Sequence, residues 1–180
     1  VAIAGTQNVL LDDARFAAAI GGEGNSLNAD YAAAIAGIAN EINGRWSAGI
    51  AGIQNNLTGS KTAVVGGRAG EASGTESVMI GSNNSSLDGH QAVIVGGEGH
   101  LLGSDSTDTR FSVILGGRFA NLNSGYCGVI SGGYGNALTT DSLWQGAQAR
   151  SIFGGKDNDN RGYYGATVVG GNGNEIFQLN

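Results

Sequence analysis

The chain of 180 residues contains no proline and one cysteine, and charged residues make up only 13% of it. The single cysteine, Cys127, excludes an intrachain disulfide framework and a cysteine-based metal site. No apolar run approaches the roughly 20 residues of a membrane-spanning helix. Disorder is excluded because a hydrophobic content of 41% with so little charge is the opposite of a disordered composition. Collagen is excluded because it needs proline.

The charge balance restricts the partners of the chain. Fifteen acidic residues against nine basic ones give a net charge of −6. Phosphate backbones and anionic lipids both need a basic face, so we expect neither nucleic acid nor direct membrane insertion. The sequence begins with Val1 and shows no signal-like segment, so we expect a fragment of a longer protein.

Glycine is abundant instead, with 34 residues, and it marks a repeat along the whole chain. Each unit has an anchor, usually the second residue of a Gly-Gly pair, and five successive spacings from Gly22 to Gly97 are 15 residues. Self-similarity at a fixed period indicates a solenoid. The anchors are Gly5, Gly22, Gly37, Gly52, Gly67, Ser82, Gly97, Gly117, Gly133, Gly155 and Gly171.

The positions around the anchor predict the shape of one coil. Short apolar runs that end at Gly-Gly, such as 92–95, predict strands of four or five residues that are buried on both faces. Asn recurs three residues after seven anchors, and since Gly and Asn tolerate positive φ, this segment predicts a tight corner. A Leu or Ile five residues after most anchors is expected to point inward. Residues 1–180 therefore predict a single all-β domain, a parallel β-solenoid of about eleven coils and roughly 50 Å in length.

A second apolar column predicts association. Ile or Val stands two residues before most anchors, and we assign this position to the inside of the coil. Strand neighbours point to opposite faces, so the residue before it is expected to point outward. A long exposed apolar stripe marks an interface, which predicts a parallel homotrimer around a threefold axis. The outward column is then Val64, Met79, Ile94, Ile114, Ile130, Ile152 and Val168, after the smaller Ala2, Ala19, Ala34 and Gly49.

These repeats resemble a known family of fibrous proteins. Ser47-Ala-Gly-Ile-Ala-Gly and Ser77-Val-Met-Ile-Gly are similar to the strand of the head repeats of trimeric autotransporter (YadA-like) adhesins, and 146–149 before Ser151 is similar to their connecting segment. The repeats also resemble the β-helical repeats of phage and giant-virus tail fibres, which the preference for Gly-Gly-x-x-Asn favours. The resemblance implies a trimer of left-handed β-rolls, extracellular, on a virion or outer cell surface, and used for adhesion. It implies no catalytic residues.

Three sets of residues are candidates for a binding site. Phe16, Tyr31 and Trp46 recur in one column beside Arg15, Asp30 and Arg45, and suit stacking on sugar rings. The alternative is that the stacked aromatic residues cap the edge of the coil or pack across subunits, and that the charges pair between coils. The two irregular coils, which start at Gly97 and Gly133, contain insertions that either bind a ligand or are tolerated loops. The proposed ligand-binding residues come from these two coils and from the coil that starts at Gly155. They are Asp105, Asp108, Arg110, Trp144, Tyr163 and Tyr164.

The remaining candidates indicate no metal, cofactor or catalysis. The segment 157–160 is faintly similar to a calcium loop but lacks the Glu that closes one, since Val168 stands twelfth. His90 and His100 are expected on the surface, at corners and far from Cys127. No constellation of nucleophile and base is visible, so we expect no enzyme and no cofactor.

The sequence thus predicts a structural or adhesive segment of a trimeric surface fibre, from a phage tail fibre or a cell-surface adhesin. Its expected partners are two further copies, adjoining segments of the same fibre, and a host surface glycan or receptor that the fibre contacts for attachment. Two alternatives are a polysaccharide-degrading, tailspike-like enzyme and a shaft with no ligand.

Overall fold

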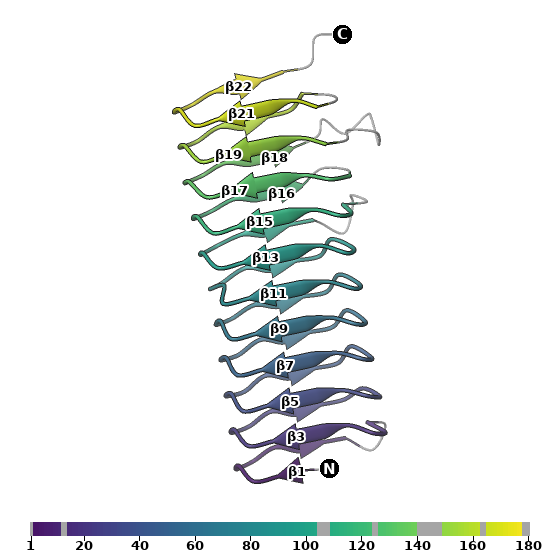
Figure 1. Ribbon diagram of the computed structural model, residues 1–180. Coiled ribbons are helices and arrows are strands. Elements are labelled where there is room, and N and C mark those ends of the chain that lie inside the picture. The colour runs from purple at the N-terminus through teal and green to yellow at the C-terminus, as the bar shows by residue number, and fades with distance from the viewer. Residues whose placement is uncertain are drawn as a thin grey trace.

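The computed structural model describes residues 2–11, 14–103, 109–123, 126–139, 149–162 and 165–177, and within these ranges it contains strands and turns but no helix. Each coil contributes two short strands, and like strands from successive coils form two sheets of eleven strands each (Figure 1). The predicted all-β parallel β-solenoid with short, regular coils is confirmed. No helix of the described residues is long and apolar enough to cross a membrane.

The first sheet contains the strands that precede each Gly-Gly corner. They are β1 (Ala2–Ile3), β3 (Ala18–Ile20), β5 (Ala33–Ile35), β7 (Ala48–Ile50), β9 (Ala63–Val65), β11 (Val78–Ile80), β13 (Val93–Val95), β15 (Val113–Leu115), β17 (Val129–Ser131), β19 (Ser151–Phe153) and β21 (Thr167–Val169).

The second sheet contains the strands that follow that corner. They are β2 (Val9–Leu10), β4 (Ser26–Leu27), β6 (Glu41–Ile42), β8 (Asn56–Leu57), β10 (Glu71–Ala72), β12 (Ser86–Leu87), β14 (Leu101–Leu102), β16 (Asn121–Asn123), β18 (Ala137–Thr139), β20 (Asp159–Asn160) and β22 (Glu175–Ile176).

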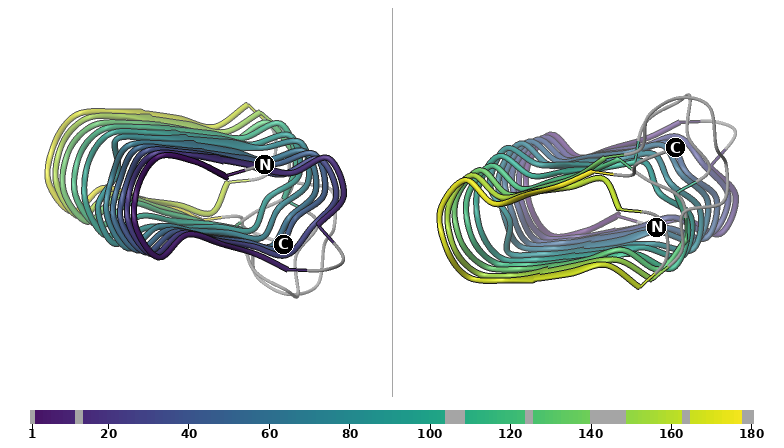
Figure 2. Two further views of the ribbon diagram at one scale, coloured as in Figure 1. Left: turned by 90° about the horizontal axis from the view of Figure 1, so that it is seen from below. Right: turned by 90° about the horizontal axis from the view of Figure 1, so that it is seen from above.

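All strand pairs are parallel and in the register that the repeat predicts. Val78 pairs with Val93, one period further along the chain, and Val93 pairs with Val113 across the longer coil. Viewed along the stack, every coil is a flattened loop in which the two sheets face each other (Figure 2). The strands have only two or three residues, shorter than expected, because a corner interrupts the ladder on both sides.

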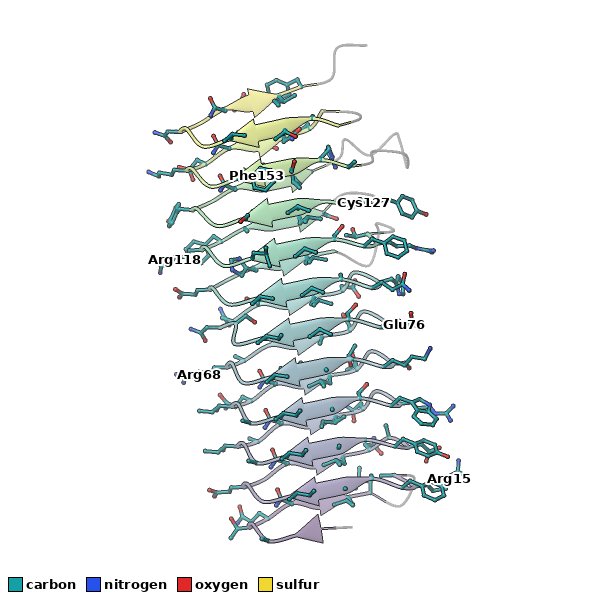
Figure 3. All side chains as sticks on the ribbon, in the orientation of Figure 1. Arg15, Arg68, Glu76, Arg118, Cys127 and Phe153 are labelled. Carbon is teal, nitrogen blue, oxygen red and sulfur yellow. The ribbon has the colours of Figure 1, made fainter. Side chains whose placement is uncertain are left out.

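The two edges of the flattened loop differ in sequence. The Gly-Gly edge, from each anchor to the Asn three residues later, carries Arg68 and Arg118 (Figure 3). The opposite edge, called here the return edge, leads from the second sheet to the first sheet of the next coil. It carries Arg15, Glu76 and Cys127 (Figure 3).

Close approach between coils explains the anchor glycine. Gly67 has φ of 78°, and a Cβ there would overlap the carbonyl oxygen of Ser82 in the next coil. Gly66, just before it, also has a positive φ of 68°, but a Cβ there would meet nothing within 4 Å. Ala36 and Ala51 accordingly occupy this position in other coils, with φ of 57° and 54°.

The asparagines of the corner do not carry the positive φ that was expected of them. That role falls to the residue before each one, such as Ala39 and Gln54. Asn25, Asn40 and Asn55 are instead buried and form a hydrogen-bonded ladder, in which each Nδ2 donates to Oδ1 of the coil before, at 2.9 Å and 3.0 Å for these three. Their amides satisfy backbone groups that the corner would otherwise leave unpaired.

The core is one column from each sheet, and one of the two is not the column that was predicted. The second sheet contributes the expected Leu/Ile column, which is fully buried from Leu27 to Leu138. The first sheet contributes the middle residue of each strand. The prediction that this column points outward is therefore wrong, because its side chains point into the core. Its buried members are Ala19, Ala34, Val64, Met79, Ile94, Ile114, Ile130, Ile152 and Val168.

The reason for the correction is that both columns are apolar. Alternation along a strand establishes only that Ile94 and Val95 point to opposite faces, not which of them faces the second sheet. Ile94 is fully buried, whereas Val95 is 36% exposed. The strands of the first sheet are therefore not buried on both faces within one chain.

Two large polar side chains, His100 and Arg150, are also buried. His100, predicted at the surface, stands in the position of the corner Asn and is 2% exposed, and its Nδ1 accepts from the Ala120 backbone N–H at 3.2 Å. Arg150 is also 2% exposed, and its Nη1 donates to the carbonyls of Thr139 at 2.7 Å and Asn160 at 3.1 Å. Asn160, which interrupts the Leu/Ile column, lies in the same polar stretch of core.

Candidate functional site

The outward side of the first sheet is apolar from β3 to β15, and Ser131, Ser151 and Thr167 interrupt it further along the stack. Two columns face outward from it, one of half-buried Ala and Val residues and one of exposed Ile and Val residues, and together they are called here the apolar face. Their rows include Ala33 with Ile35, and Val93 with Val95. Its exposed members are Ile20, Ile35, Ile50, Val65, Ile80, Val95, Leu115, Phe153 and Val169, and Ser131 interrupts it at β17.

The outward side of the second sheet is mostly polar. Asn43 donates from Nδ2 to Glu41 at 2.8 Å, and the Ser73 hydroxyl donates to Asp88 at 2.9 Å. Val9 and Leu101 are exposed exceptions. Only one of the two sheet faces therefore carries continuous apolar surface.

The return edge holds the aromatic column, and its rings stack on one another. The centroids of Phe16 and Tyr31 are 5.1 Å apart and those of Tyr31 and Trp46 are 3.9 Å apart, with planes within 10°. Beside them, Arg15 and Arg45 approach Asp30 with nitrogen–oxygen distances of 2.9 Å and 3.9 Å. The Arg15 side chain, which donates to Asp30, holds the pKa of that carboxyl below its ordinary value. This is the alternative of stacked aromatic residues and paired charges. The stack covers both ring faces of Tyr31, whereas Phe16 and Trp46 at its two ends are 79% and 54% exposed.

Further along the same edge lies a polar hollow of about 290 Å³. It is lined by Thr75, Glu76, His90, Gln91 and Arg110, from three successive corners. Lys61 and Gln91, through their side chains, donate to the two carboxylate oxygens of Glu76 at 2.6 Å and 2.8 Å. These two hydrogen bonds, the one from Lys61 foremost, hold the pKa of Glu76 below its ordinary value. The hollow thus contains an ionised acceptor with a fixed orientation.

Arg110 reaches this hollow from the edge of the coil that contains the first insertion. Its backbone forms parallel bridges with His90 below and Tyr126 above. The guanidinium carbon lies 5.9 Å from the centroid of the Tyr126 ring, within the range of a cation–π contact. The next residue, Phe111, is 52% exposed.

Of the six predicted ligand-binding residues, the structure places Arg110 in the hollow. Asp105, Asp108, Trp144, Tyr163 and Tyr164 lie outside the described residues.

The sequence reasoning missed Thr75, Glu76, His90 and Gln91. The available signal was the column of Lys61, Glu76 and Gln91, which continues the positions of Phe16, Tyr31 and Trp46 at the same period. Because these residues are one period apart, their side chains lie side by side on successive coils.

The segment 157–160 uses its carboxylates in ion pairs. Asp157 lies 3.7 Å from Lys156 and Asp159 lies 2.7 Å from Arg161. Among the described residues, no group of three His, Cys, Asp or Glu side chains is arranged to hold a metal ion.

Comparison with known proteins gives no match. Neither protein-family models, nor curated proteins, nor solved structures yield a protein similar to this chain. Function is therefore argued from the chain's own surfaces.

Proposed function

We propose that this chain is a structural and adhesive segment of a trimeric surface fibre that contributes to attachment to a host or partner surface through glycans. Such a fibre belongs outside the cell, on a virion or on an outer cell surface. The segment performs no chemistry, and its partners are two further copies of itself, adjoining segments of the fibre and a surface glycan.

The main observation that supports this proposal is the apolar face. Eleven strands at about 4.8 Å spacing make it about 50 Å long, and three-residue strands make it about 10 Å wide, which gives a footprint of roughly 500 Å². Contiguous apolar patches of several hundred Å² on soluble proteins mark interaction sites. A second copy suits this face because its partner must be equally long, flat and repetitive.

Threefold symmetry is favoured by exposed apolar side chains on the Gly-Gly edge, which lie in two groups separated by Arg68, Asn83 and Glu98. Ile38, Ile53, Phe119 and Tyr134 are each between 39% and 48% exposed there. In a ring of three, each chain contacts its two neighbours with two different patches, whereas a twofold dimer needs only one self-complementary patch. The apolar face and the Gly-Gly edge provide two such patches side by side.

Sedimentation of the wild-type chain and three variants tests the assembly. Ile80, Val95 and Leu115 are replaced together by Asp on the apolar face, and we expect the wild-type trimer to become a folded monomer. Leu101→Asp is the matched control, since Leu101 is 38% exposed on the opposite face and its replacement leaves the trimer intact. Ile94→Asp places a charge in the core and is expected to unfold the chain.

A wild-type chain that sediments as a stable monomer at micromolar concentration contradicts the proposal. A triple variant that remains trimeric contradicts the choice of the apolar face as the interface.

A further inference from the structure

The hollow on the return edge is built differently from the rest of that edge. In the coils nearer the N-terminus, the side chains of Phe16, Tyr31 and Trp46 stack on one another. At the hollow, Thr75, Glu76, His90, Gln91 and Arg110 leave a space of about 290 Å³ between them. This volume is at the lower end for ligand pockets and suits a ligand of one ring.

The groups around the hollow suit hydroxyl groups. Both oxygens of Glu76 already accept one hydrogen bond, from Lys61 and from Gln91, and a carboxylate has about four acceptor sites in all. It can therefore accept two hydroxyl protons without losing its present partners. His90 also lines the hollow, and its ring carries an N–H donor, so a ligand with neighbouring hydroxyls finds a donor as well as acceptors.

Fixed backbone contacts hold these walls in place. The Gln91 backbone N–H donates to the Thr75 carbonyl at 2.9 Å, and the Phe111 N–H donates to the His90 carbonyl at 3.2 Å. Gln91 and Phe111 both have left-handed backbone, with φ of 51° and 52°. Three successive coils thus present their side chains in a constant geometry, which reduces the ordering cost of binding.

Phe111 adds an apolar surface beside the hollow. It is 52% exposed, and its neighbours in the column are Gln91 below and Cys127 above, neither of which is aromatic. Among the described residues no aromatic ring stacks on Phe111, whereas Tyr31 has a ring on each face. A pyranose ring has one face of C–H groups and a rim of hydroxyls, which match such a ring beside such a hollow.

We propose that this hollow binds one neutral hexopyranose unit of a surface polysaccharide, with hydroxyls on Glu76 and Gln91 and the C–H face against Phe111. The negative charge of Glu76 and the net charge of −6 disfavour an acidic sugar. The inference rests on the proposed function, in which three equal sites in a trimer raise a weak affinity through multivalency. No bond of the ligand is made or broken.

Saturation-transfer NMR with monovalent probes tests the site. The probes are the methyl glycosides of glucose, galactose and mannose, with methyl glucuronide as the acidic comparison. We expect millimolar binding of at least one neutral glycoside, weaker binding of the glucuronide, and at least tenfold weaker binding in Phe111→Ala and in Glu76→Gln. Trp46→Ala, from the stacked column of the same edge, is the matched control and should bind within twofold of wild type.

Monovalent probes bind whether or not the chain is trimeric, so the two proposals fail separately. Loss of the trimer in sedimentation with retained glycoside binding contradicts only the assembly. An intact trimer overturns the site if it binds none of the neutral glycosides, prefers the glucuronide, or loses binding in Trp46→Ala but not in Phe111→Ala.

Discussion

The side-chain amide of Asn40 donates from Nδ2 to Oδ1 of Asn25 in the coil before, 2.9 Å away, in a corner where both side chains are buried. Oδ1 of Asn40 in turn accepts from the backbone N–H and from Nδ2 of Asn55, at 3.1 Å and 3.0 Å. The side-chain amide of Asn40 therefore links three successive coils. Because it is buried, its polar atoms form hydrogen bonds with protein groups and not with water.

Asn40→Ala is expected to destabilise the solenoid by about 2 kcal/mol, because it leaves the buried Asn55 backbone N–H without its acceptor and removes one of the two acceptors of Asn55 Nδ2. The measurement is the midpoint of guanidinium unfolding. Asn174 is the matched control, since it ends the ladder and is exposed, and Asn174→Ala should cost less than about 1 kcal/mol. Equal effects of the two substitutions would show that the ladder contributes little.

The two glycines of one corner are expected to differ sharply. Gly66→Ala places a Cβ in open space and costs about 1 kcal/mol, the strain of left-handed backbone less the gain from a stiffer unfolded chain. Gly67→Ala pushes a Cβ into the carbonyl of Ser82 and should prevent the coils from stacking. Thermal unfolding of both variants checks this. A Gly67→Ala protein as stable as Gly66→Ala would contradict the close approach of the coils.

His100 predicts a loss of stability in mild acid. Burial lowers the pKa of His100 below its ordinary value of 6.5, so the fold favours the neutral ring, whose Nδ1 accepts from Ala120. The contribution is complete above pH 6.5 and is lost as the pH falls through that value toward the lower pKa of the folded state. Unfolding free energy measured from about pH 8 to about pH 5 should therefore fall more steeply in wild type than in His100→Asn, which restores the usual corner residue.

The depressed pKa values of Asp30 and Glu76 affect stability only at lower pH, below about their ordinary values of 3.8 and 4.5. A wild-type slope equal to that of His100→Asn would contradict the assigned role of the buried ring.

Part of the candidate site was predictable from sequence and part was not. Arg110 was predicted because it follows an insertion, which interrupts the regular surface. Glu76 and Gln91 belong to regular coils and have no unusual spacing, so nothing in their local sequence indicates a hollow. The hollow arises where three successive corners with different side chains lie side by side. Its presence depends on how these corners are placed relative to one another in three dimensions.

The regular period of the sequence by itself determined the fold class, the parallel register and the two apolar columns, because each repeated position lies directly above its equivalent. It did not determine which column of the first sheet is the core. Ile94 and Val95 are equally apolar, and a period of two along a strand establishes only that they point in opposite directions. The turn of the Gly-Gly corner decides which of them faces the Leu/Ile column across the coil. Only the tertiary structure therefore shows that Ile94 is core, that Val95 is surface, and that His100 is buried in the place of an asparagine.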